Sequence, residues 1–245
     1  MEVRNELRYS PALGHDMEHR VYGSGSGQPL LAFASLGGRL WDWEGFGMVD
    51  ALAYLIEAGR LTLICADGVD WQSWTNGSIP PGDRARRNDD YDRYLAAELI
   101  PALTTELGRE TLWTAGCSMG AYHAANTFFR HPEQLDGMIA VSGLYQPRMF
   151  VGDYSDETVY LNAPLWYLPN LEDEWYLERY RRSRIVFCIG QGAWEEECLA
   201  DTREMQRVLA AKRVPAEFDY WGHDVEHDWP QWKRMIPYWL ERLGV

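Results

Sequence analysis

A serine between two glycines is the residue of this chain best placed for covalent chemistry. Ser118 stands in Gly-Cys-Ser-Met-Gly over residues 116–120, which fits the pattern G-x-S-x-G. A short apolar run ends just before it, and a helical pattern over 121–129 follows. A strand, a sharp turn and a helix form the setting in which such a serine projects as a nucleophile. The glycines leave room for the strained backbone of that turn. The alternative is an ordinary glycine-rich turn.

The base that such a serine requires is expected late in the chain. Two histidines, His223 and His227, lie between the last predicted strand and the closing helical pattern. We favour His227, because Asp228 suits a helix N-cap and Pro230 suits the first turn, which fixes the nearby backbone. The alternatives are a structural pair or a metal site, since histidines four residues apart share a metal on a helix. Gly222 and Pro230 indicate a loop, so we expect no metal.

The acid that orients the base is expected directly after the predicted strand 184–190. The candidates there are Glu195, Glu196, Glu197 and Asp201. Glu195 is closest to the strand end and is our choice, and Glu is an accepted acid in such triads. The other three fall near the start of a predicted helix, where a carboxylate is favourable simply because of the helix dipole.

The reaction of a serine with a carbonyl also needs two backbone N–H donors for the oxyanion. Met119 follows the nucleophile, and Leu36 lies in the Ser-Leu-Gly-Gly turn after an early predicted strand, so these two residues are the expected donors. An ordinary turn is the alternative for the second one. Trp74, Tyr145 and Trp166 are candidates for an aromatic pocket wall, and core packing explains each of them equally well.

The elements that would position these residues alternate between buried strands and helices. Near-continuous apolar runs, typical of a parallel sheet covered on both faces, lie at 30–35, 61–66, 137–142 and 184–190. Helical spacing is found at 48–58, 92–107, 198–212 and 230–243. The pattern predicts an α/β fold class, with residues 1–245 as a single domain built on a mostly parallel central sheet with helices on both faces. An alternating segment around 18–22 predicts an antiparallel edge strand.

One segment breaks the alternation. Residues 144–183 are rich in tyrosine and tryptophan and follow a strand end, where open sheets bind their ligands. We interpret this segment as a short aromatic-rich cap or pocket insertion. The alternative is a connection that only covers the edge of the sheet.

Composition excludes several partners. The 245 residues carry a net charge of −14, which opposes binding to nucleic acid or to an anionic membrane. No apolar run reaches the length of a membrane span, and the first residues lack the apolar core of a secretory signal. Four cysteines without a CxxC pair indicate buried thiols in a reducing cytoplasm. The twelve tryptophans suit a homodimer and a closed pocket equally.

Together these residues resemble the Putative esterase family of the α/β-hydrolase superfamily. That family includes esterase D (S-formylglutathione hydrolase), feruloyl esterases, enterobactin esterases and mycolyltransferases of the antigen 85 type. The resemblance covers most of the chain and rests on segments 9–14, 35–38, 92–101, 116–122, 190–195 and 227–232.

The resemblance implies an α/β-hydrolase fold with Ser118 as nucleophile, His227 as base and Glu195 as acid, and it implies no cofactor. Esterase D relatives usually carry Asp as the acid, whereas the mycolyltransferases carry Glu. Ala121 stands where the family usually has a second glycine after the elbow.

Our first hypothesis is a cytoplasmic serine carboxylesterase that acts on a small-molecule ester through an acyl-enzyme on Ser118. An acyltransferase with the same triad is the second hypothesis, and a non-catalytic binding protein with the same fold is the third. The sequence does not separate ester from amide substrates, and it does not specify the acyl group or the alcohol.

Overall fold

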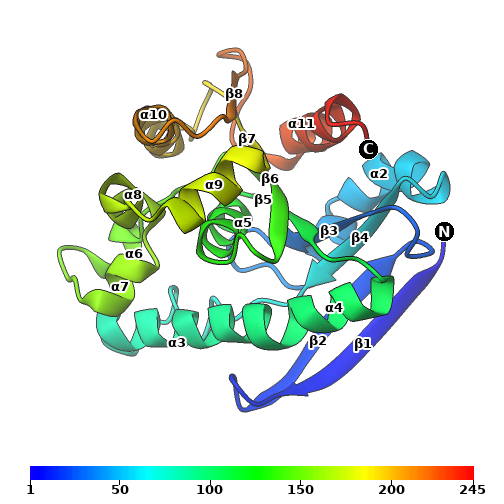
Figure 1. Cartoon of the computed structure of the whole chain (residues 1–245), viewed down its shortest axis with the longest axis horizontal. Helices are drawn as coiled ribbons and strands as arrows, with labels where there is room; N and C mark the ends of the chain where they lie inside the picture. Colours follow the sequence, from blue (N-terminus) through cyan, green and yellow to red (C-terminus); the bar gives the residue numbers. More distant parts are fainter.

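The computed structural model describes residues 1–245 and contains one eight-stranded sheet (Figure 1). The strand order is β1-β2-β4-β3-β5-β6-β7-β8. Strand β2 runs antiparallel to both of its neighbours, β1 and β4, and all other neighbouring strands are parallel. The bounds are β1 Val3–Ser10, β2 His15–Tyr22, β3 Gln28–Phe33, β4 Leu61–Ala66, β5 Leu112–Cys117, β6 Leu135–Val141, β7 Arg184–Ile189 and β8 Glu217–Tyr220. The predicted α/β class with a mostly parallel sheet is confirmed.

Helices cover both faces of this sheet, as expected. On one face α2 packs beside α11, and on the other lie α3, α4, α5 and α10. The bounds are α1 Asp42–Gly45, α2 Met48–Glu57, α3 Pro81–Tyr94, α4 Ile100–Leu107, α5 Met119–Arg130, α6 Arg148–Val151, α7 Glu157–Leu161, α8 Pro164–Tyr167, α9 Glu174–Arg182, α10 Glu196–Ala211 and α11 Trp229–Arg242. None of these helices is long and apolar enough to cross a membrane.

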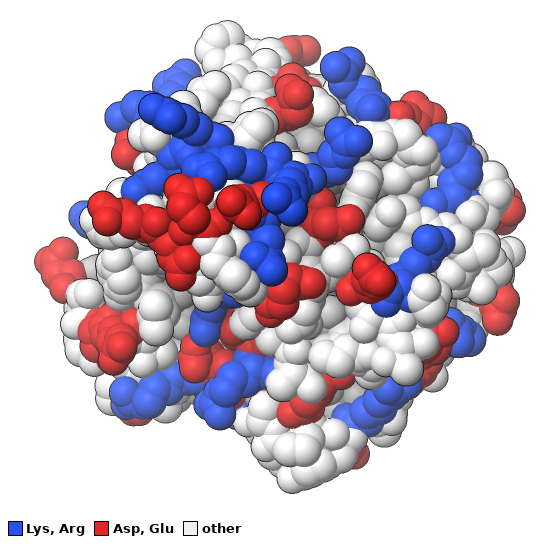
Figure 2. Space-filling view, in the orientation of Figure 1, with Lys and Arg blue, Asp and Glu red and all other residues white.

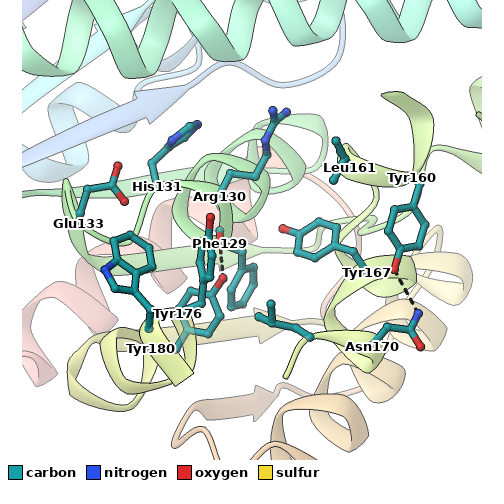
Figure 3. Close-up of a pocket in the computed structure, with 12 residues that line it drawn as sticks. Phe129, Arg130, His131, Glu133, Tyr160, Leu161, Tyr167, Asn170, Tyr176 and Tyr180 are labelled. Atoms are coloured by element: carbon teal, nitrogen blue, oxygen red, sulfur yellow. Dashed lines mark hydrogen bonds between the residues drawn. The ribbon is translucent and has the colours of Figure 1, made fainter. Parts of the chain in front are cut away.

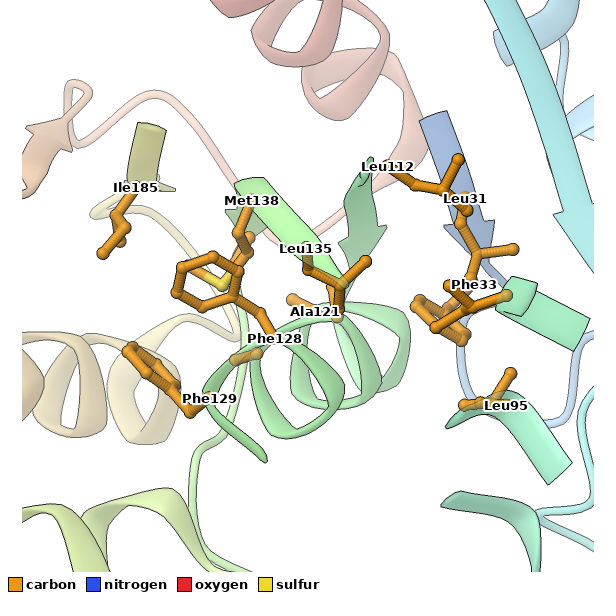
Figure 4. Close-up of a cluster of buried hydrophobic side chains, with 14 of the residues drawn as sticks. Leu31, Phe33, Leu95, Leu112, Ala121, Phe128, Phe129, Leu135, Met138 and Ile185 are labelled. Atoms are coloured by element: carbon orange, nitrogen blue, oxygen red, sulfur yellow. The ribbon is translucent and has the colours of Figure 1, made fainter. Parts of the chain in front are cut away.

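The core on the α5 face holds α5 against the strands that carry the site. Phe128 and Phe129 of α5 pack with Met138 of β6 and Ile185 of β7 (Figure 4). All four side chains are buried, and truncating a buried Phe to Ala typically costs about 3–5 kcal/mol. This packing holds α5, which begins directly after Ser118, against the strands.

Two elements differ from their predicted bounds. The segment around 18–22 is antiparallel, but it forms the inner strand β2, and β1 is the edge. Both faces of β1 carry charged or exposed side chains, so no apolar pattern marked it. The helical region expected at 92–107 begins earlier, at Pro81. The sequence analysis missed its first part because α3 is too polar to show an apolar stripe. A π-helical turn, Leu95–Leu99, precedes Pro101, whose missing N–H disrupts regular helical bonding.

The insertion 144–183 is built from four short helices, α6 to α9, and a 3₁₀ turn. Asp156 and Asp173 cap α7 and α9 by accepting hydrogen bonds from Val159 and Trp175 N–H groups. Helix α8 contacts α5 and α10, and α9 contacts β6. Most of the insertion therefore packs over the α5 side of the sheet, and only its first residues reach the cavity described below.

Surface charge is mixed. Figure 2 shows Lys and Arg side chains interspersed with Asp and Glu over the face in view. The excess of acidic residues is therefore not gathered into one continuous patch on that face.

Candidate active site

Ser118 lies at a strained turn between β5 and α5. Its φ is 57° and its ψ is −121°, a backbone conformation that residues other than glycine rarely adopt. A Cβ on Gly116 would stand 2.1 Å from the carbonyl carbon of Gly120, and a Cβ on Gly120 would stand 2.4 Å from the carbonyl oxygen of Phe33. Both glycines are therefore required by the close approach of β5, α5 and β3.

Ala121 fits without a clash at the position where the family that the sequence resembles usually has a second glycine. Ala121 packs against Gly143, where an added Cβ would lie 2.7 Å from the Cβ of Ala121. The missing side chain at Gly143 thus provides the room that Ala121 occupies.

A hydrogen-bonded chain links three side chains from distant parts of the sequence. His227 Nε2 lies 2.9 Å from Ser118 Oγ, and His227 Nδ1 lies 3.0 Å from Glu195 Oε2. A carboxylate only accepts, so we assign the imidazole proton to Nδ1. Nε2 is then free to accept the proton of the serine hydroxyl. The structure thus brings together the three side chains that the sequence analysis selected as candidate nucleophile, base and acid.

The backbone around His227 is tied to the loop that carries Glu195. The His227 N–H donates to the Ala193 carbonyl at 3.0 Å, and the Gly192 N–H donates to the Val225 carbonyl at 2.8 Å. Trp232 of α11 packs against the His227 imidazole in an edge-to-face arrangement, with ring centroids 4.9 Å apart. These contacts fix the base relative to its acid.

His223, the competing histidine, lies away from this chain. It is exposed, and its Nδ1 faces the Gln191 carbonyl at 3.2 Å. Asp228 caps α11 with a 2.7 Å bond from the Trp229 N–H, as expected.

Ser142 completes the environment of Glu195 and was missed by the sequence analysis. Its buried hydroxyl donates to Glu195 Oε1 at 2.5 Å and accepts a bond from Trp232 Nε1 at 3.2 Å. Ser142 directly follows β6 and has a φ of 53°, just as Ser118 directly follows the neighbouring β5 and has a φ of 57°. The only sequence signal was a serine before a glycine at a strand end, which is too common to single out.

The other acid candidates have different surroundings. Asp201 accepts bonds from the Tyr145 N–H at 2.8 Å and from Gln146 Nε2 at 2.7 Å, and burial raises its pKa. It therefore anchors the start of the insertion. Glu196 and Glu197 are exposed at the first turn of α10.

The two residues expected to donate to the oxyanion, Met119 and Leu36, line the same cavity as Ser118. Met119 is the first residue of α5, so its N–H has no acceptor within its own helix. Leu36 lies in a turn whose preceding residue, Ser35, is bonded to Asp42. Asp42 Oδ2 accepts hydrogen bonds from the Ser35 N–H at 2.8 Å and from the Ser35 hydroxyl at 2.9 Å. A Cβ on Gly38 would stand 2.5 Å from the Asp42 carboxyl carbon, so the turn packs closely on this buried acid.

A cavity of about 400 Å³ opens at the serine. It is lined by Leu36, Ser118, Met119, Leu144, Met149, Phe150, Trp194, Glu196, Glu197, Cys198 and His227. The insertion supplies only Leu144, Met149 and Phe150. It thus forms one wall of the cavity and covers the sheet elsewhere.

The three aromatic residues proposed for the wall do not line this cavity. Trp74 is buried and stacks on Phe150, so it supports a wall residue from behind. Tyr145 is buried with its ring edge on Phe187. Trp166 is partly buried and donates from Nε1 to Gln146. Large aromatic side chains occur in cores and in pockets, so the sequence alone could not distinguish a core role from a cavity-lining role for these residues.

A larger cavity of about 560 Å³ lies at the opposite, C-terminal end of α5. Tyr160, Tyr167, Tyr176 and Tyr180 line it together with Phe129, as Figure 3 shows. It contains none of the triad residues.

A potential metal-ligand group overlaps the triad. Donor atoms of Glu195, Cys198 and His227 lie within 4.8 Å of one another. The carboxylate and the imidazole already bond to each other, and burial raises the pKa of the Cys198 thiol, which opposes the thiolate that a metal needs. The carboxylate and the imidazole are thus already paired in the arrangement expected of a triad.

Similar proteins are found among solved structures. A ferulic acid esterase is 17% identical with a TM-score of 0.75, covering 99% of this chain and 96% of that one. MPT51 (FbpC1) of Mycobacterium tuberculosis is 16% identical with a TM-score of 0.75, covering 99% and 98%. The S-formylglutathione hydrolase FrmB of Staphylococcus aureus is 13% identical with a TM-score of 0.69, covering 99% and 96%. At these identities the likeness shows the fold.

Family membership comes from the sequence itself. No curated protein matches the chain significantly. The family model described as Putative esterase matches residues 10–243, which is nearly the whole chain. The chain therefore belongs to the Putative esterase family and is a carboxylic-ester hydrolase with the α/β-hydrolase fold.

Proposed function

We propose that this enzyme hydrolyses esters through an acyl-enzyme on Ser118. The observation that carries the proposal is the chain of hydrogen bonds from Ser118 Oγ through His227 to Glu195. Each group has the partner that its role requires, and the nucleophile opens into a cavity of about 400 Å³.

The first half of the reaction forms the acyl-enzyme. Ser118 Oγ attacks the ester carbonyl as His227 Nε2 takes its proton. The N–H groups of Met119 and Leu36 stabilise the oxyanion, an effect worth about 3–4 kcal/mol for one donor in a comparable site. His227 then gives its proton to the departing alcohol.

The second half releases the acid. Water enters, His227 Nε2 accepts a proton from it, and the water oxygen attacks the acyl carbonyl. The tetrahedral intermediate then breaks its bond to Ser118 Oγ, which takes the proton back from His227 as the carboxylic acid leaves. Glu195 stabilises the imidazolium in both halves and keeps the Nδ1–H oriented toward itself. No step needs a cofactor.

Ser118→Ala tests this proposal. We expect the rate of p-nitrophenyl acetate hydrolysis to fall at least about 10⁴-fold, since removal of a triad nucleophile has effects of that size. A fluorophosphonate should label the wild type and not the variant. Ser73→Ala is a matched control, because it also removes a buried hydroxyl, one that bonds to the Val69 carbonyl away from the triad. Undiminished turnover in Ser118→Ala would refute the proposal.

The acyl-enzyme could equally pass its acyl group to an alcohol. Product analysis with added alcohols separates the two reactions, because an acyltransferase gives a new ester in preference to the free acid.

A further inference from the structure

The cavity at Ser118 is lined by acidic side chains and, apart from His227, by no basic ones. Its lining includes two carboxylates, Glu196 and Glu197, and no lysine or arginine. Both side chains are exposed to solvent at the first turn of α10. A substrate that enters the cavity therefore meets a negative potential.

Trp194 adds an aromatic surface to the same wall. It is 81% exposed, more than any other large hydrophobic side chain of the protein. It lines the cavity together with Glu196 and Glu197. Its loop is held by the hydrogen bond from the Gly192 N–H to the Val225 carbonyl. An accessible indole attracts cations through its ring face.

A neighbouring cavity of about 310 Å³ continues from this wall and shares Leu144, Met149 and Glu197 with it. It contains one basic residue, Arg148, and a second carboxylate, Asp201. Two carboxylates against one guanidinium do not reverse the sign of the potential. The negative character thus continues beyond the serine cavity.

We propose that the enzyme selects esters that carry a positive charge, such as a quaternary ammonium group, close to the scissile bond. The carboxylates of Glu196 and Glu197 attract the cation, and the indole of Trp194 contacts it. Anionic esters are disfavoured by the same groups. This inference rests on the proposed hydrolysis at Ser118.

Two matched sets of substrates test it. In the first, p-nitrophenyl esters carry acyl chains of equal length that end in trimethylammonium, tert-butyl or carboxylate. In the second, acetylcholine is compared with 3,3-dimethylbutyl acetate, which places the charge on the alcohol. In at least one set we expect kcat/KM at low salt to be about fivefold or more higher for the cation than for its neutral isostere. The ratio should fall as salt is added, because both carboxylates are exposed.

Variants then locate the effect. Glu196→Gln combined with Glu197→Gln should bring the cation-to-neutral ratio close to one. Trp194→Leu should lower the ratio less. The control is Glu2→Gln combined with Glu110→Gln, two exposed residues remote from the cavity, which changes the net charge equally and should keep the wild-type ratio. Ratios within one variant cancel any general loss of activity.

The outcomes separate the two proposals. If the neutral esters are hydrolysed and neither set favours the cation, the inference is wrong and the esterase proposal stands. If a preference exists but survives in the Glu196 and Glu197 variant, these residues are not its source and the inference is also wrong. If no ester is hydrolysed and fluorophosphonate does not label Ser118, both proposals fall.

Discussion

Removal of the Ser142 hydroxyl should weaken catalysis without touching a triad residue. Ser142 Oγ donates to Glu195 Oε1 at 2.5 Å, while His227 uses the other carboxylate oxygen. In Ser142→Ala, Oε1 loses this donor in a place that is closed to water, since both residues are buried. The carboxylate is then free to turn, and the imidazole loses its fixed orientation.

The magnitude follows from the type of bond. A hydrogen bond to a charged group contributes about 1.5–3 kcal/mol. If all of it is expressed in the transition state, kcat falls roughly 10-fold to 150-fold, at 1.36 kcal/mol per factor of ten. KM for a small ester should stay nearly constant, because Ser142 does not line the cavity. The rate of fluorophosphonate labelling should fall by the same factor as kcat.

Three variants make the measurement decisive. Ser142→Gly also removes the hydroxyl but relaxes the backbone at a φ of 53°, so it separates the hydrogen bond from backbone strain. Ser73→Ala removes another buried hydroxyl and should lower stability alone. Wild-type kcat in both Ser142 variants would show that Glu195 is held without this bond, and our reasoning would be refuted.

Further substitutions test other parts of the structure. Gly116→Ala should prevent folding or lower the melting temperature sharply, because the new Cβ would lie 2.1 Å from backbone atoms of Gly120. Gly77→Ala is the control, since a Cβ there meets no atom within 4 Å; equal melting temperatures of the two variants would contradict the close packing. Glu195→Gln should reduce kcat by about 10³-fold or more, since an amide can favour the wrong imidazole tautomer, and a kcat within a few-fold of wild type would remove Glu195 from the triad. Burial raises the pKa of Asp42 above its usual 3.8, so the ionised form is disfavoured in the folded state. Wild type should therefore lose stability relative to Asp42→Asn as the pH rises from about 3 through the raised pKa, and a difference in melting temperature that is constant with pH would contradict this.

Local sequence patterns were sufficient for the strand, turn and helix around Ser118. The glycines that permit the turn and the apolar strand before it are neighbours in the chain, so a short window contains the whole signal. His227 and Glu195 were reached through chain order and element boundaries. Those boundaries were accurate here, because β7 is a continuous apolar run and α10 and α11 have apolar residues at helical spacing.

Contacts between residues that are distant in sequence could not be predicted from local patterns. Ser142 bonds to a residue 53 positions away, and nothing in its own segment identifies that partner. The helices of the insertion are four to nine residues long, too short for a clear periodic pattern. The role of Trp74 depends on whether Phe150 or solvent covers it, which only the packing decides.

The hydrogen bonds of the triad have a consequence for folding. His227 and Ser118 are 109 residues apart in sequence, and Ser142 and Glu195 are 53 apart. Parallel pairing of β5, β6 and β7 and docking of α11 must all be complete before these groups meet. Contacts of such long range form late, because loop closure costs entropy before the contact can stabilise anything. During refolding, helical structure should therefore return first and esterase activity last, so catalysis reports on completion of the native topology.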